Sequence, residues 1–274
     1  MDFSFTEEQL LLEDTVRRFV AKDYTFERRR AILASAEGWS REAWQQLADL
    51  GLLALNVPEA HGGLGGGPVD TLVVMNALGP GLPLEPYLAS AVAATALLRE
   101  CPAQAGLLAK MAAGERIVVV ADEKERQAIG RLPALAAAPD MLFGTARVGD
   151  VWALFLVPRD AAGLTLDSYP TLDGTRAAEV HLAGVRLPAA ARLEAGREAL
   201  ARARDVELAA LCAEAVGIMK ATLDATVEYL RTRRQFGQPI GRFQALQHRA
   251  ADMLMHYEQA KSMSLLAALR SYLA

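Results

Sequence analysis

The residues best suited to chemistry gather in one segment, residues 229–247, which reads YLRTRRQFGQPIGRFQALQ. Arginines close a helical pattern there, Phe236 and a Gly-Pro turn follow, and Phe243 and Gln244 open a second helical pattern. Arginine pairs with phosphate oxygens, and a phenylalanine ring offers a flat apolar face to a ligand. Arginine at a helix C-terminus also complements the helix dipole, so these residues taken singly favour an ordinary capped helical hairpin.

A glycine-rich run at residues 62–67 is the second candidate for binding chemistry. It lacks a preceding strand and the GxGxxG or GKS/T spacing that surrounds a phosphate with backbone amides. We therefore expect a turn between helices, in which glycine supplies a positive φ. The four histidines, His61, His181, His248 and His256, are scattered, so we expect no metal site and no Ser-His-Asp arrangement.

Helical patterns occupy the first part of the chain. Thr6 and Gln9 form a capping box, and apolar residues at positions 12, 16, 19 and 20 then recur on one helix face. Further helices are expected over residues 41–50, 70–78, 89–99 and 104–111.

From about residue 115 the pattern changes. Short β-branched or aromatic runs at residues 117–121, 152–158, 179–182 and 185–188 predict strands of a small β domain. Two long helices follow, over about residues 204–234 and from about residue 243 to the end. This order of helices, strands and helices predicts an α+β fold in segregated layers rather than a βαβ repeat.

Composition argues against several classes of protein. Of the 274 residues, 52% are hydrophobic and 23% are charged, and 29 basic against 33 acidic residues give a net charge of −4, without the basic excess of a nucleic-acid binder. No apolar run is long enough to span a bilayer, and the N-terminus has no signal-peptide pattern. Two cysteines, Cys101 and Cys212, cannot form a disulfide framework. We therefore expect a cytoplasmic protein without membrane insertion.

Several stretches together resemble the acyl-CoA dehydrogenase family. They are FTEEQ at 5–9, LGLL at 50–53, VPE at 57–59 with Gly62, Gly63 and Gly65, and RRQFGQPI at 233–240 with Phe243, Gln244 and Gln247. The last is the most specific, and the resemblance covers nearly the whole chain. Within the family the sequence is most similar to the small subunit of pimeloyl-CoA dehydrogenase-type enzymes, on DGTRAAE at 173–179 and CAEAVG at 212–217.

The resemblance implies three domains, with FAD between the second and the third. These are an N-terminal helical domain over 1–114, a middle β domain over 115–198 and a C-terminal helical bundle over 199–274. By matched position, Arg233, Phe236 and Gln244 correspond to residues that hold the adenosine and pyrophosphate of FAD, generally across a subunit interface. The implied reaction is α,β-desaturation of an acyl-CoA thioester, with electrons passing to an electron-transferring flavoprotein.

Glu207 is the candidate catalytic base. In a subset of the family the glutamate that removes the α-proton lies early in the first bundle helix, and alignment on residues 205–224 puts Glu207 there. Such a base must be poised, because an ordinary glutamate with a pKa near 4.3 is too weak. A solvated acidic residue in the first turn of the helix fits the same position equally well.

Two parts of the family pattern are missing from this sequence. Around residues 119–127 it lacks the Thr-Glu-Pro and Gly-Ser-Asp motifs that clasp the flavin ring, so the β barrel is expected to be abridged. Two helices of the bundle are missing as well, and the chain stops in an apolar helical segment. We therefore expect an exposed stripe of Leu246, Met253, Tyr257 and Leu265 that a partner or a missing tail would cover.

These observations favour a flavin-dependent acyl-CoA dehydrogenase subunit that works with a homologous subunit. Its other expected partners are the acyl-CoA substrate and the electron-transferring flavoprotein. Two alternatives stay open at this point: a non-catalytic structural or regulatory subunit of such a complex, and an acyl-CoA-binding module without redox chemistry.

Overall fold

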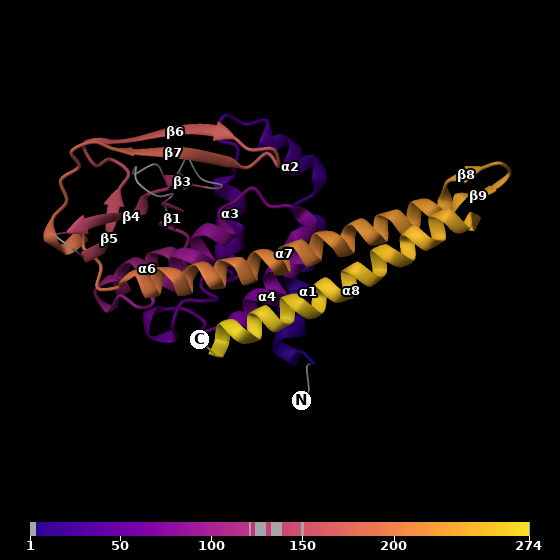
Figure 1. Cartoon of the computed structure of the whole chain (residues 1–274), viewed down its shortest axis with the longest axis horizontal. Coiled ribbons are helices and arrows are strands. Elements are labelled where there is room, and N and C mark those ends of the chain that lie inside the picture. The colour runs from indigo at the N-terminus through magenta and orange to yellow at the C-terminus, as the bar shows by residue number, and fades with distance from the viewer. Residues whose placement is uncertain (1–3, 121, 124–129, 133–138, 149–150, 274) are drawn as a thin grey trace. The chain divides into compact units, whose positions relative to one another are not determined.

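Long helices and two small sheets make up most of the chain (Figure 1). The computed structural model describes residues 4–120, 122–123, 130–132, 139–148 and 151–273. The order of helices, then strands, then helices confirms the predicted α+β class. The described strands form open sheets that do not close a barrel. Residues 121 and 124–127 of the stretch that lacks the flavin-ring motifs lie outside the described residues.

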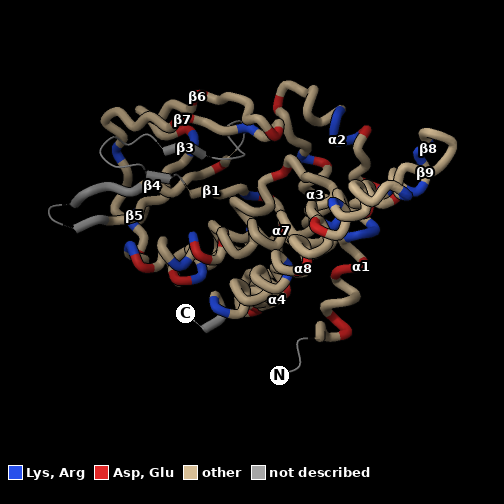
Figure 2. The backbone as a smooth tube through the Cα atoms, turned by 45° about the vertical axis from the view of Figure 1, so that its right-hand side comes forward, with Lys and Arg blue, Asp and Glu red and all other residues tan. Residues whose placement is uncertain are grey.

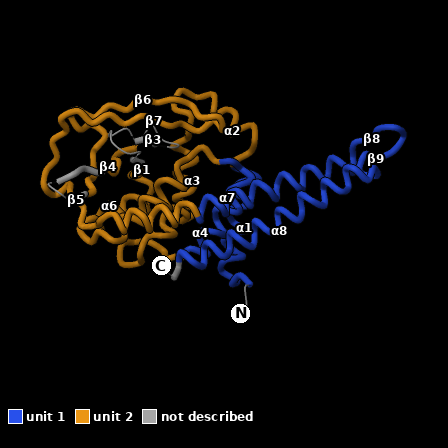
Figure 3. Tube along the Cα trace, viewed as in Figure 1, with its two compact units in different colours: residues 1–23, 68–82, 209–273 blue, residues 24–67, 83–208, 274 orange. Residues whose placement is uncertain are grey.

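The chain divides into two compact units (Figure 3). Unit 1 contains residues 1–23, 68–82 and 209–273, and unit 2 contains residues 24–67 and 83–208. The 36-residue helix α7 (Arg197–Thr232) therefore begins in unit 2 and continues in unit 1.

Unit 1 starts with α1 (Glu7–Lys22), whose predicted capping box is confirmed. The Gln9 amide donates to Thr6 Oγ1 at 3.2 Å, and the Thr6 amide donates to Gln9 Oε1 at 3.1 Å. The Gln9 side chain also donates to Asp70 Oδ1, at 2.9 Å, on α4 (Pro68–Leu78). The predicted apolar face of α1 is confirmed too, because Val16 and Phe19 are buried.

A helical hairpin follows α4 in unit 1. It comprises α7 from residue 209, the short strands β8 (Arg234–Gln235) and β9 (Gln238–Pro239), and α8 (Gln244–Leu273). Tyr257 is only 9% exposed and packs in a cluster with Val216 and Leu223 of α7. The expectation of an exposed stripe through Tyr257 is therefore wrong, because that face of α8 packs on α7. The exposed large apolar side chains of α8 are instead Leu254, Met255, Met263 and Leu266.

Unit 2 holds the other helices and both larger sheets. The helices are α2 (Phe26–Leu33), α3 (Arg41–Asp49), a π-helix (Tyr87–Ala94), α5 (Thr95–Leu98) and α6 (Ala105–Ala112). One sheet has the order β1 (Val118–Val120), β4 (Met141–Val148), β5 (Val151–Pro158), with β1 parallel to β4. The other has the order β2 (Asp122–Glu123), β3 (Gly130–Leu132), β7 (Arg176–Leu182), β6 (Leu164–Pro170), all antiparallel.

Several expected elements of unit 2 differ in the structure. The predicted strand at 185–188 is wrong, because these residues form no ladder and Pro188 has no amide hydrogen to donate to one. The helix predicted over residues 89–99 begins at Tyr87, and its first part, Tyr87–Ala94, is a π-helix that continues into α5. The turn predicted at residues 62–67 is confirmed, with positive φ angles of 81° at Gly62 and 65° at Gly65.

Two glycines allow α7 to approach α4 and the turn after it within unit 1. A Cβ atom on Gly217 would lie 2.1 Å from the carbonyl oxygen of Asn76, and one on Gly79 would lie 2.5 Å from that of Glu214. Backbone oxygens cannot move aside as a flexible side chain can, so only glycine fits at these positions.

We expect Gly217→Ala to lower the free energy of unfolding by about 1–3 kcal/mol, because the added methyl group must push two backbone segments apart. Gly106→Ala is the matched control, since a Cβ atom there meets nothing within 4 Å on α6. The control should be neutral or stabilising by up to about 1 kcal/mol. Urea unfolding measures both, and equal stabilities would contradict the close approach.

Candidate functional site

A two-residue reversal, Phe236–Gly237, joins β8 to β9 at the end of the α7–α8 hairpin (Figure 1). The ladder pairs Gln235 with Gln238, so these two residues alone form the loop. Both have positive φ, 52° and 77°, as in the type I′ turns that suit tight hairpins. Phenylalanine is unfavourable there, because its Cβ approaches the backbone and costs about 1–2 kcal/mol.

The strain at Phe236 is not offset by burial. Its ring is 89% exposed, and it meets Phe243 edge-on with ring centroids 6.0 Å apart. Strained backbone that persists without a packing reason is typical of binding sites. The turn therefore holds the Phe236 ring outside the packed part of unit 1.

Hydrogen bonds fix the backbone around this turn. Arg234 Nη2 donates to the carbonyl oxygen of Gly237 at 3.3 Å, and Gln247 Nε2 donates to that of Gly241 at 2.8 Å. The Ile240 amide donates to the Arg233 carbonyl oxygen, also at 2.8 Å. We call residues 233–244 the tip loop. Its backbone is held in place by the protein itself.

The tip loop brings together all three predicted cofactor-binding residues. Arg233 follows the end of α7, Phe236 lies in the turn and Gln244 is the first residue of α8. Arg233 and Gln244 are exposed, and within the described residues their side chains have no hydrogen-bond or ion-pair partner. A guanidinium group, a flat ring and an amide are thus free to meet a ligand.

The tip loop and its flanks are basic. Residues 231–242 include Arg231, Arg233, Arg234 and Arg242 and no acidic residue, and Figure 2 shows this positive charge beside β8 and β9. A pyrophosphate pairs with such guanidinium groups, and an adenine ring stacks on an aromatic face. The donor set therefore fits the adenosine diphosphate part of FAD.

Glu207, the predicted base, lies on α7 within unit 2, whereas the tip loop lies in unit 1. It is ten residues beyond Arg197, where the helix begins, and is half-buried. Glu207 therefore does not lie in the first turn of its helix, because α7 starts earlier than the sequence pattern indicated. Arg202 anchors this part of α7, since its Nε donates to Glu100 Oε1 at 3.0 Å.

Sequence reasoning missed a buried polar cluster in unit 2. Burial raises the pKa of Glu85, whose Oε1 accepts a hydrogen bond from the Ser40 amide at 3.1 Å. The neighbouring Tyr24 hydroxyl accepts one from the Leu84 amide at 2.9 Å. The cluster joins the start of α3 to the segment before the π-helix, which is a structural role.

Two features are absent from the described residues, a membrane-spanning helix and a metal-binding cluster. None of the helices is both long and apolar enough to cross a membrane. Within the same residues no three His, Cys, Asp or Glu side chains gather as they would around a metal ion.

Comparison with known proteins identifies the family. A model of the acyl-CoA dehydrogenase N-terminal domain matches residues 6–115, and one of the C-terminal domain matches residues 194–271. Acyl-CoA dehydrogenase IpdE2 of Mycolicibacterium smegmatis is 33% identical over 94% of this chain and 75% of its own length. IpdE2 of Mycobacterium tuberculosis is 34% identical over 93% of this chain and 74% of its own length.

Solved structures agree with this result. The ChsE4-ChsE5 complex from Mycobacterium tuberculosis contains a chain that superposes with a TM-score of 0.89 and 28% identity, over 99% of this chain and 79% of that one. A variant of the Tcur3481-Tcur3483 steroid acyl-CoA dehydrogenase matches with a TM-score of 0.87 and 29% identity. The match covers 97% of this chain and 78% of that one. The chain therefore belongs to the acyl-CoA dehydrogenase family of FAD-dependent oxidoreductases.

Proposed function

We propose that this chain is one subunit of a hetero-oligomeric acyl-CoA dehydrogenase that desaturates an acyl-CoA thioester between its α and β carbons. The tip loop carries the proposal, because it keeps an exposed phenylalanine in a strained conformation beside a free Arg233 and a free Gln244. The similar ChsE4-ChsE5 protein is a complex of two different chains, which supports the hetero-oligomeric assembly.

In this proposal Arg233 pairs with the pyrophosphate of FAD, the Phe236 ring stacks on the adenine, and the Gln244 amide donates to the same part of the cofactor. FAD, when bound, supplies the acceptor for the β-hydride. Because all three side chains face outward at an exposed loop, they suit a cofactor that is shared with a neighbouring subunit.

Glu207 is the proposed base that removes the α-proton. It is half-buried on α7, and the positions that match the family place its carboxylate where the base of that subset lies. An electron-transferring flavoprotein would then take up the electrons.

The organisation and location of the protein are part of the same proposal. The family's three domains would occupy residues 1–114, 115–198 and 199–274, and the matches to the two family models at 6–115 and 194–271 support the outer two. The two free cysteines, Cys101 and Cys212, support a cytoplasmic location.

The visible spectrum of the purified complex of this chain with its homologous subunit tests cofactor binding. We expect flavin absorbance in the wild-type complex and its loss on gel filtration of Phe236→Asn, since loss of one aromatic stacking partner weakens binding about tenfold or more. Stability should be unchanged or rise by up to about 1 kcal/mol, because asparagine tolerates a positive φ.

Phe26→Asn is the matched control, because this ring is also exposed, at 67%, but lies on α2 in unit 2. It should retain the flavin. A wild-type complex without flavin absorbance would overturn the proposed function.

Replacement of the base separates catalysis from cofactor binding. Glu207→Gln in the reconstituted complex should lower the desaturation rate by about 10²–10⁴-fold and leave the flavin spectrum unchanged, because only proton removal is lost. Asp205→Asn, an exposed neighbour on α7, is the control and should keep the wild-type rate. An unchanged rate in Glu207→Gln would instead favour a structural subunit.

A further inference from the structure

The buried carboxyl of Glu85 lies where two segments of the chain enter unit 2. The chain passes from unit 1 to unit 2 between residues 23 and 24, and again between residues 82 and 83. Tyr24 therefore begins one of these segments, and Leu84 and Glu85 lie at the start of the other. The Leu84 amide donates to the Tyr24 hydroxyl oxygen at 2.9 Å, so a hydrogen bond joins the two segments directly.

The carboxyl of Glu85 extends this junction to the start of α3. Its Oε1 accepts a hydrogen bond from the Ser40 amide at 3.1 Å, and the carboxyl is also hydrogen-bonded to the Tyr24 hydroxyl. Ser40 is the N-cap residue of α3, and its own hydroxyl accepts a hydrogen bond from the Ala43 amide at 3.1 Å. One carboxyl thus connects the segments that precede α2, α3 and the π-helix.

The surroundings of this carboxyl disfavour a negative charge. Only 5% of Glu85 is exposed, and its Oε2 has no hydrogen-bond partner among the described residues. A buried carboxylate is costly unless hydrogen-bond donors and a counter-ion compensate for the lost water. Burial therefore raises the pKa of Glu85, so the intact junction favours the neutral carboxyl.

On the side of α2, charged groups offset this burial only in part. Arg28 lowers the pKa of Glu85, but burial raises that pKa by more. The Arg28 guanidinium group also serves α3, because its Nη2 lies 3.5 Å from Glu42 Oε1. Arg29, the next cation along α2, donates to the carbonyl oxygen of Asp173 at 2.9 Å.

The other groups around the junction are neutral or bonded elsewhere. Burial raises the pKa of the Tyr24 hydroxyl and that of Tyr87, so both stay protonated. Tyr87, the first residue of the π-helix, donates to the carbonyl oxygen of Leu52 at 3.1 Å. At the start of α3, the Arg41 guanidinium carbon lies 5.2 Å from the centre of the Trp39 ring.

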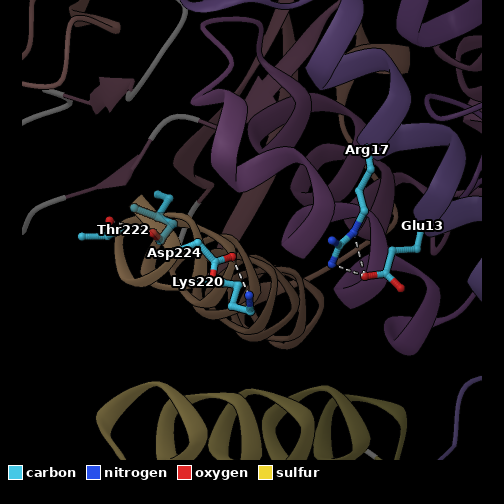
Figure 4. Close-up of polar contacts among 6 residues, drawn as sticks. Glu13, Arg17, Lys220, Thr222 and Asp224 are labelled. Atoms are coloured by element: carbon cyan, nitrogen blue, oxygen red, sulfur yellow. Dashed lines mark hydrogen bonds and ion pairs between the residues drawn. The ribbon is translucent and has the colours of Figure 1, made fainter. Parts of the chain in front are cut away.

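Figure 4 shows how carboxylates are satisfied elsewhere in the chain. Glu13 pairs with Arg17 on α1 at 2.6 Å, and Asp224 pairs with Lys220 on α7. In both pairs the cation lies four residues further along the same helix, where the two side chains are neighbours. Glu85 has no such ion pair among the described residues, so the state of its own proton decides whether the junction holds a charge.

We propose that Glu85 is a proton-dependent clamp. As a neutral carboxyl it holds together the segments before α2, α3 and the π-helix, and when it loses its proton to solvent the junction opens and admits water to the carboxylate. Leu82, three residues earlier, has a strained positive φ of 49°, which opening would allow to relax. The clamp is a property of the folded chain and does not depend on the proposed function.

Hydrogen exchange of the Ser40 and Leu84 amides in the full chain tests the clamp, because opening exposes both. In the open form Glu85 has an ordinary pKa near 4.3, so above about pH 4.3 it loses a proton that the closed form keeps. We therefore expect the protection of both amides, corrected for the intrinsic pH dependence of exchange, to fall up to about tenfold per pH unit above this value. It should level off at the raised pKa of Glu85. Protection that does not change with pH would overturn the inference.

Glu85→Gln separates the clamp from other effects of pH. Its amide side chain has no proton to lose, so we expect the protection of the Ser40 and Leu84 amides to be independent of pH over the same range. Glu37→Gln is the matched control, because Glu37 is exposed and lies three residues before Ser40. It should keep the pH dependence of the wild-type chain. The same dependence in Glu85→Gln would contradict the clamp.

A direct titration of the wild-type chain keeps the proposal testable if Glu85→Gln folds poorly. With ¹³C-labelled glutamate side chains, we expect the carboxyl carbon of Glu85 to titrate above the ordinary range, at the pH where amide protection levels off. A midpoint at or below the ordinary value would overturn the inference. None of these measurements involves flavin or a second subunit, so their failure would leave the proposed function untouched.

Discussion

The backbone reversal at Phe236 and Gly237 is the constraint on which the candidate site depends. Two successive positive φ angles turn the chain within two residues, so α8 returns along α7 and Arg233 and Gln244 lie at the two ends of one loop. Glycine adopts such an angle at no steric cost, but phenylalanine does not. Replacing Phe236 by a residue that tolerates a positive φ, such as glycine, would relieve the strain but would also remove the aromatic ring. Under the proposed function, stability and cofactor binding therefore make opposite demands on this position.

The close contact of α7 with α4 and its following turn gives the hairpin a firm base in unit 1. At Gly217 and Gly79 the backbones approach closely enough to exclude any side chain. Beyond that contact, the cluster of Val216, Leu223 and Tyr257 joins α8 to α7. The position of the tip loop thus depends on packing between segments that are far apart in sequence.

Local signals predicted the parts of the fold that local chemistry decides. The capping box of Thr6 and Gln9 needs only four residues, and it forms as expected. Val185–Pro188 has the alternation of a strand, but a strand also needs a neighbour to accept its hydrogen bonds, and the pattern cannot supply one. The burial of Tyr257 likewise depends on which face of α8 meets α7. Its apolar character alone does not decide that.

The same distinction applies to the candidate site. The types and spacing of Arg233, Phe236 and Gln244 were visible in the sequence, because a conspicuous motif carries them. The positive φ of Phe236 was not visible, since the motif indicated a Gly-Pro turn and the reversal occurs one residue earlier, at Phe-Gly. An open groove between α7 and α8 was also hidden, because its lining comes from two separate segments, residues 220–231 of α7 and residues 250–258 of α8.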